Sequence, residues 1–139
     1  MIHKHIINEK AKIIPTGRLP DGAVTGNGDL SVTWGGRPDR VELYIAKADF
    51  WHADQRLGVP NGPSPIGIVD IRMPYFAYSP YCVEENMDEC KLVGKYTAEG
   101  FDATLTVIVH AIDNTILIEE DRTFPGLSTS MVLANMGEQ

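Results

Sequence analysis

The densest group of side chains that could do chemistry lies in two short segments, residues 25–30 (TGNGDL) and 44–51 (YIAKADFW). They carry one amide, two carboxylates, one ammonium group and one indole, on Asn27, Asp29, Asp49, Lys47 and Trp51. Polar and charged groups of this kind can hydrogen-bond sugar hydroxyls, and an indole face can stack on the C–H groups of a sugar ring. The residue types therefore indicate a carbohydrate-binding surface or an interface with another domain, provided that the chain brings the two segments together.

A β-hairpin is the element that must position them. Leu30–Trp34 and Val41–Ile45 are predicted strands, and the sequence GGRPDR at 35–40 predicts the turn between them. In such an antiparallel pair, residues near 29 lie opposite residues near 46, on strands about 4.8 Å apart. We therefore expect the Asp29 and Lys47 side chains to meet. By the same register, Asn27 would lie next to Asp49 or Trp51.

Each of these residues also has a purely structural interpretation. The two glycines around Asn27 are typical of a tight turn with the asparagine in the left-handed region. A phosphate-binding loop is disfavoured, because a strand follows the glycines where a helix N-terminus would be needed, and Asp29 would repel phosphate. Lys47 and Asp49 could form a surface ion pair worth well under ~1 kcal/mol.

Catalytic and metal-binding patterns are weak elsewhere in the chain. Asp49 and Asp54 could serve as a glycosidase pair only if they stood about 5–9.5 Å apart, and acidic residues are common enough to make this weak evidence. No serine lies in a nucleophile elbow and no cysteine has a nearby histidine. His3 and His5 alternate on one side of a possible strand without a third ligand at suitable spacing. The sequence predicts no catalytic residue, no metal and no cofactor.

The order of these motifs carries a family resemblance. GNGDL at 26–30, WGG at 34–36, an aliphatic strand and KADFW at 47–51 together resemble the N-terminal β-sandwich domain of large glycoside hydrolases. The relevant enzymes are those of the family 95 fucosidase type and related uncharacterised hydrolases. The resemblance is densest over roughly residues 11–60 and fades afterwards.

The resemblance implies that hydrolysis happens elsewhere. In that family the catalytic carboxylates lie in a following (α/α)-barrel of several hundred residues, which the 139 residues here do not include. The implied partners are a carbohydrate and the missing barrel domain. The last predicted strand has no closing turn, which also indicates a cut inside a larger protein. The alternative is a self-sufficient carbohydrate-binding or adhesion module.

The whole chain reads as one all-β domain, residues 1–139, with the short apolar segments and frequent turns of an antiparallel β-sandwich. The predicted strands are Leu30–Trp34, Val41–Ile45, Ile66–Met73, Lys91–Thr97, Phe101–Ile112, Thr115–Glu119 and Ser128–Met136. Asp113 and Asn114 form a predicted hairpin turn. A short turn of helix is possible around Ala46–Arg56, and Leu57–Pro65 is a predicted loop.

Charge and composition limit the partners. The formal net charge is −7 and no lysine–arginine cluster is present, which argues against nucleic acid. No apolar run approaches the ~20 residues of a membrane span. Residues 1–6 lack the apolar region of a signal peptide, so we expect a cytoplasmic protein, or a secreted or periplasmic one whose leader was removed.

Two further segments leave alternatives open. Cys82 and Cys90 enclose seven residues of an acidic loop and could form a disulfide in an exported protein, or remain thiols in the cytosol. The segment 74–81 (PYFAYSPY) places four aromatic residues between prolines and is expected to be irregular and exposed. Aromatics in such a segment can form a sugar platform or a domain interface, and we favour the interface.

Overall fold

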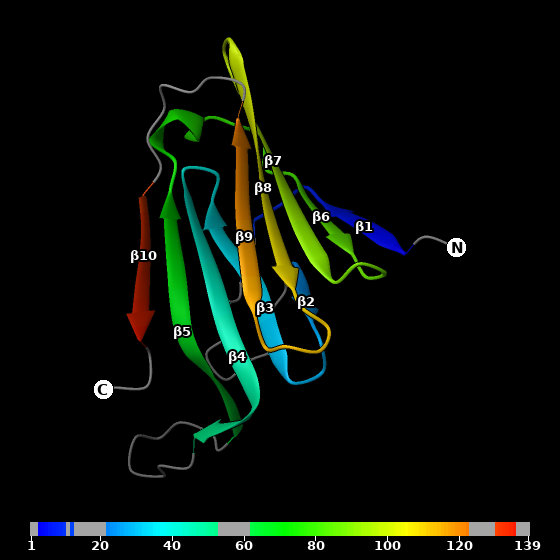
Figure 1. Ribbon diagram of the computed structural model, residues 1–139. Coiled ribbons are helices and arrows are strands. Elements are labelled where there is room, and N and C mark those ends of the chain that lie inside the picture. Colours follow the sequence, from blue (N-terminus) through cyan, green and yellow to red (C-terminus); the bar gives the residue numbers. More distant parts are fainter. Residues whose placement is uncertain (1–2, 11, 13–21, 53–61, 123–129, 136–139) are drawn as a thin grey trace.

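Two antiparallel β-sheets packed face to face make up the computed structural model, which describes residues 3–10, 12, 22–52, 62–122 and 130–135 (Figure 1). The first sheet has the order β1 (Lys4–Ile7), β6 (Val83–Asn86), β7 (Lys91–Ala98), β8 (Phe101–Val109) and β9 (Ile116–Arg122). The second has the order β10 (Ser130–Asn135), β5 (Gly62–Arg72), β4 (Arg40–His52), β3 (Leu30–Arg37) and β2 (Val24–Gly26). A single 3₁₀ turn, η2 (Pro74–Phe76), is the one helical element among the described residues. The predicted all-β sandwich is confirmed.

The seven predicted strands are all present, although β8 ends at Val109 and not at the predicted Ile112. In some of them the apolar residues alternate with the period of a strand. β8 is the clearest case, since Ala103, Leu105, Val107 and Val109 are buried while the residues between them are partly exposed. Side chains from both sheets interdigitate in the core, and the largest fully buried ones are Trp34, Phe76, Leu43, Ile71, Met73, Leu92 and Leu105.

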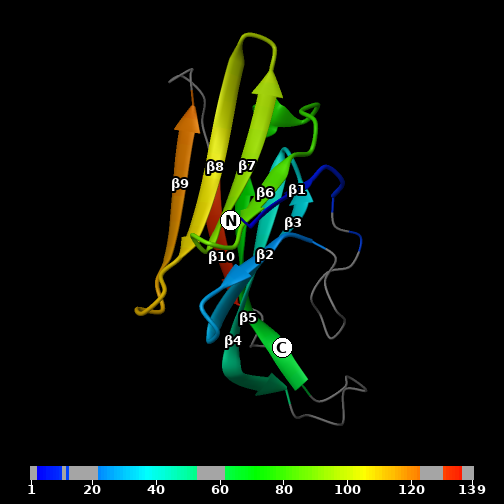
Figure 2. The same ribbon diagram turned by 90° about the vertical axis from the view of Figure 1, so that its right-hand side faces the viewer.

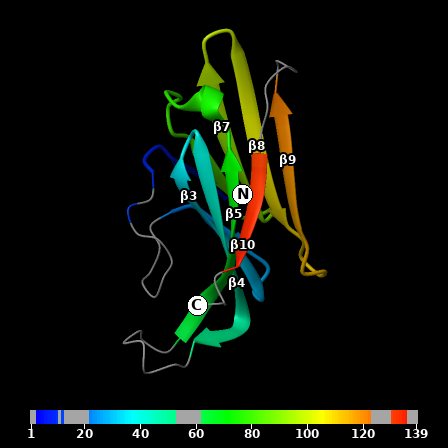
Figure 3. The same cartoon turned by 90° about the vertical axis from the view of Figure 1, so that its left-hand side faces the viewer.

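β4 and β5 are longer than the sequence predicted. β4 remains extended to His52, so a helical turn is wrong for residues 46–52. β5 begins at Gly62, so the predicted loop is wrong for residues 62–65, and residues 53–61 lie outside the described part of the chain. The pairing of β4 with β5 shifts register on both sides of Ala46. Such an irregularity, like a β-bulge, lets the two strands continue to pair beyond it. The ends of both strands extend past the first sheet in Figures 1, 2 and 3.

Three short strands, β1, β2 and β6, were not predicted. β6 lies in the segment expected to be an acidic loop, and Glu85 at its centre is buried. The carboxylate of Glu85 accepts a hydrogen bond of 2.7 Å from the Val24 backbone N–H of the other sheet and lies 3.3 Å from His5 Nδ1 of β1. A buried carboxylate is tolerated when it is hydrogen-bonded and paired in this way.

Trp34 of β3 packs directly against Gly94 of β7 in the other sheet. Trp34 is fully buried, and a methyl group built on Gly94 would lie 2.6 Å from its Cζ2 atom and 2.7 Å from its Cη2 atom. The same methyl group would lie 2.7 Å from the Tyr96 hydroxyl oxygen. Glycine inside a strand is typical of such a close approach, because any side chain there would occupy the space of the ring.

Both cysteines are free thiols, and the register of the β6–β7 hairpin explains why. The Cys82 carbonyl accepts a hydrogen bond from Lys95 N at one end of the hairpin, whereas Cys90 lies in the turn, next to the Asn86↔Lys91 pair at the other end. Four residues of extended chain separate Cys82 from Asn86, a span of about 13 Å. Because bridged cysteines have Cα atoms within about 7 Å, the disulfide alternative is excluded in this fold.

Candidate functional site

The predicted hairpin of β3 and β4 is present, and its turn lies one residue later than expected. The strands pair from Leu30↔Lys47 to Arg37↔Arg40, so the connection contains only Pro38 and Asp39. Gly36 adopts a φ of +84° next to this turn, which allows the ladder to continue through the two glycines. The shift places Asp29 opposite Ala48, whose N–H donates a hydrogen bond of 2.7 Å to the Asp29 carbonyl.

Asp29 and Lys47 meet as expected, although the register differs from the predicted one and places Lys47 opposite Leu30. The Lys47 Nζ atom lies 3.5 Å from Asp29 Oδ2, and both side chains are partly exposed. A small hollow of about 210 Å³ opens beside the pair, lined by Gly28, Asp29, Leu30, Ser31, Ala46, Lys47 and Ala48. The corner therefore presents one carboxylate and one ammonium group at the rim of a recess. We call these residues, together with Asn27, the hairpin corner.

Asn27 holds the loop that precedes β3. Its Oδ1 atom accepts hydrogen bonds from the backbone N–H groups of Asp29 (2.9 Å) and Leu30 (2.8 Å), and its own N–H donates to the Leu30 carbonyl (3.1 Å). The left-handed conformation expected for Asn27 is wrong, because Gly28 takes the positive φ, +95°, and Cys90 is the one described non-glycine residue with a positive φ. The glycine has no Cβ to clash, so it adopts that conformation at lower cost.

The Asn27 side chain also joins the two sheets. Its Nδ2 atom donates to the His110 carbonyl and to Asn114 Oδ1, each at 2.9 Å, in the connection between β8 and β9. Asn114 Nδ2 in turn donates to Asp29 Oδ2 at 2.7 Å. A continuous polar network thus runs from Lys47 through Asp29 and Asn114 to Asn27.

The structure places three of the five predicted residues together, namely Asn27, Asp29 and Lys47. Asp49 and Trp51 belong to β4 by their backbone, but their side chains lie outside the described residues, as does Asp54. Asn114 and His110 were missed. They lie more than 80 residues from Asn27, and no local pattern shows which loops will meet after the sheets pack.

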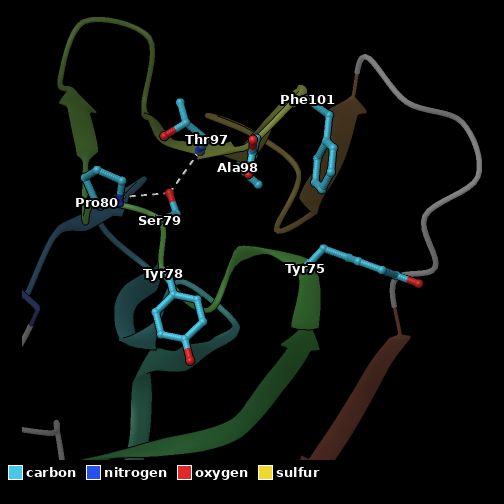
Figure 4. Close-up of a pocket in the computed structure, with 8 residues that line it drawn as sticks. Tyr75, Tyr78, Ser79, Pro80, Thr97, Ala98 and Phe101 are labelled. Carbon is cyan, nitrogen blue, oxygen red and sulfur yellow. Dashed lines mark hydrogen bonds between the residues drawn. The ribbon is translucent and has the colours of Figure 1, made fainter.

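A second, larger hollow lies against the aromatic segment that follows β5 (Figure 4). It has a volume of about 550 Å³ and is lined by Tyr75, Tyr78, Ser79, Pro80, Thr97, Ala98, Glu99 and Phe101. We call it the tyrosine hollow. The segment is only partly irregular and exposed as expected, because η2 forms there and Phe76 is buried in the core. Tyr78 is fully exposed and Tyr75 is about half exposed.

Other kinds of site find no support in the described ranges. No three His, Cys, Asp or Glu side chains within 3–10, 12, 22–52, 62–122 and 130–135 gather to hold a metal ion. In that part of the chain, no helix is long and apolar enough to cross a membrane.

Comparison of the sequence with models of known protein families gives no match, and comparison with curated proteins gives none either. The geometry of the corner and the hollow is therefore the basis for any assignment of function.

Asn27→Ala should lower the free energy of unfolding by about 2 kcal/mol, because it removes hydrogen bonds on both sides of the sheet interface. Urea unfolding followed by tryptophan fluorescence would measure the change. Asn8→Ala is the matched control, since Asn8 is exposed, and a surface substitution of this kind is expected within about 0.5 kcal/mol of the parent. Equal stability of the two variants would show that the Asn27 network contributes nothing.

Proposed function

We propose that this chain is the N-terminal β-sandwich domain of a glycoside hydrolase, and that the hairpin corner lines part of its sugar-binding cleft. In this proposal the residues that cleave the glycosidic bond belong to a helical-barrel domain, which the sandwich supports. The antiparallel two-sheet fold is the fold that the sequence resemblance implies.

The observation that carries the proposal is the convergence of Asp29 and Lys47 at the rim of a recess. A carboxylate accepts hydrogen bonds from sugar hydroxyls and an ammonium group donates to them, so the pair can hold adjacent hydroxyls of one ring. Asn114, from the connection between β8 and β9, donates to the Asp29 carboxylate, and Asn27 accepts a hydrogen bond from the Asp29 backbone N–H. The two contacts position Asp29 before any ligand arrives.

The size of the recess favours a shared cleft. Pockets that enclose a whole ligand measure about 300–1,000 Å³, whereas the recess at the corner measures about 210 Å³. It can hold part of a sugar, with the remaining contacts made by a second domain. The charge also fits, because the corner pairs one positive with one negative group and the net charge of −7 disfavours anionic ligands.

A sugar titration tests the proposal. The ¹⁵N-labelled 139-residue chain is titrated with methyl glycosides of L-fucose, D-galactose and D-glucose, and the amide signals of Asp29, Leu30 and Ala48 are followed by NMR. We expect saturable shifts in the millimolar range for at least one glycoside, and a loss of these shifts in Lys47→Met.

The matched control is Lys95→Met. Lys95 is an exposed lysine of β7 whose ion pair with Glu84, 3.6 Å, resembles that of Lys47 with Asp29. Its removal should leave the corner shifts unchanged. The proposal fails if no glycoside shifts the corner amides, or if Lys47→Met and Lys95→Met have the same effect.

A self-sufficient carbohydrate-binding module is the alternative, and the tyrosine hollow favours it. Its volume of about 550 Å³ is within the range of pockets that enclose a whole ligand. A module could bind sugar at that hollow alone, whereas the front domain of a hydrolase requires binding at the hairpin corner. The same titration distinguishes the two by whether the corner amides respond.

A further inference from the structure

We infer that the tyrosine hollow is a second carbohydrate-binding site, which takes one neutral pyranose ring between the η2 segment and the β7–β8 hairpin. The inference rests on the proposed function only for the class of ligand. Figure 4 shows Tyr75 and Tyr78 on the η2 side, with Thr97, Ala98 and Phe101 on the hairpin opposite.

The aromatic residues on one side of the hollow pack against the hydrophobic core. Tyr75 packs edge-on against Phe101, with ring centroids 6.4 Å apart and planes at 81°. Phe101 in turn packs edge-on against the buried Phe76 at 5.5 Å. This stack fixes the orientation of Tyr75, so its ring loses little freedom when a ligand binds.

Tyr78 provides the second aromatic surface. Its relative exposure is 101%, which is unusual for a large side chain with a mostly apolar ring. The backbone beside it is held in place, because Ser79 Oγ accepts a hydrogen bond of 2.9 Å from Thr97 N and donates one of 3.2 Å to the Pro80 carbonyl. An exposed tyrosine on an anchored backbone can cover the apolar face of a sugar ring while its hydroxyl stays in water.

The hairpin side supplies polar groups for the hydroxyls. Thr97 and Glu99 are both exposed and line the rim. The Glu99 carboxylate can therefore accept hydrogen bonds from two adjacent sugar hydroxyls. Aromatic faces beside a carboxylate and a hydroxyl match a pyranose, which is apolar on one face and polar at its edge.

The lining excludes other small ligands. None of the eight lining residues is a cation, so the hollow offers nothing to neutralise phosphate, sulfate or an acidic sugar. A purely apolar ligand would bury the Glu99 carboxylate without a partner, which is costly. A neutral ligand rich in hydroxyl groups avoids both penalties.

The two candidate sites are independent of each other. The tyrosine hollow includes Phe101 at the start of β8, whereas the hairpin corner contacts the His110 carbonyl just beyond its end. Nine residues of extended strand separate them by about 30 Å. A single sugar ring cannot reach both sites, so each can succeed or fail without the other.

The experiment uses the same labelled chain and the same three methyl glycosides, with the amides of residues 97–101 as reporters. We expect saturable shifts there for at least one glycoside. Tyr78→Ala should raise the dissociation constant about fivefold or more, the effect of losing one aromatic stacking contact. Tyr75→Ala and Glu99→Gln should each weaken binding as well, whereas Met87→Ala, which removes an exposed apolar side chain elsewhere, should not.

Three results would overturn the inference: no shifts at residues 97–101, shifts that persist unchanged in Tyr78→Ala, or shifts that follow protein concentration without sugar. The last would identify the hollow as a contact between copies of the chain. Responses of Asp29 and Ala48 are scored separately, so failure at the hollow leaves the proposed role of the hairpin corner intact, and failure at the corner leaves the hollow intact.

Discussion

Gly94→Ala should lower the free energy of unfolding by about 2–3 kcal/mol, the cost typical of overpacking a tight core. The added methyl group would lie 2.6 Å from the buried Trp34 ring and 2.7 Å from the Tyr96 hydroxyl oxygen. A ring that is fully enclosed cannot move aside without displacing its neighbours, so relief of the clash disturbs the packing between the sheets.

Urea unfolding of the parent and the variant measures this effect. Gly100→Ala is an informative control, because a methyl group there meets nothing within 4 Å and its cost comes from the positive φ of +85°. Comparison of the two variants therefore separates the cost of overpacking from the cost of backbone strain. Stability of Gly94→Ala within about 0.5 kcal/mol of the parent, the range of neutral surface substitutions, would show that the sheets are less tightly packed than the structure indicates.

The sequence predicted the parts of the fold that local patterns govern. The alternation in β8 and the glycine–proline turn between β3 and β4 are contained within a few residues, so each could be recognised directly. β6 could not, because its glutamates indicate a solvated loop. Glu85 is buried there only because Val24 and His5, more than 60 residues away, supply its partners.

In the candidate site, too, contacts within one hairpin could be predicted and contacts between the two sheets could not. Asp29 and Lys47 belong to one hairpin, so the sequence was enough to predict that they meet, although the turn lies one residue later than predicted and the register is shifted. Asn114 was recognised as a turn residue, but its place beside Asn27 depends on how the second sheet lies over the first. The same holds for Thr97 and Glu99, which become part of a hollow only because η2 packs against the β7–β8 hairpin.

Trp34→Ala should be the most destabilising of these substitutions, with a loss of about 3–5 kcal/mol, the range for truncating a buried aromatic residue. Trp34 has no exposed surface and its ring fills the space above Gly94, so its removal leaves a cavity between the sheets. Thermal and urea unfolding followed by far-ultraviolet circular dichroism would measure the loss without relying on the fluorescence of the deleted residue.

A double-mutant cycle tests whether Trp34 and Gly94 act as one contact. In the Trp34→Ala background, Gly94→Ala should cost much less than in the parent, because two of its three close contacts are with the missing ring. Residues in direct contact show coupling energies of about 0.5–3 kcal/mol, whereas distant residues add independently. Additive losses would mean that Trp34 and Gly94 stabilise the sandwich separately. Strong coupling would show that their direct contact is one of the places where the two sheets are held together.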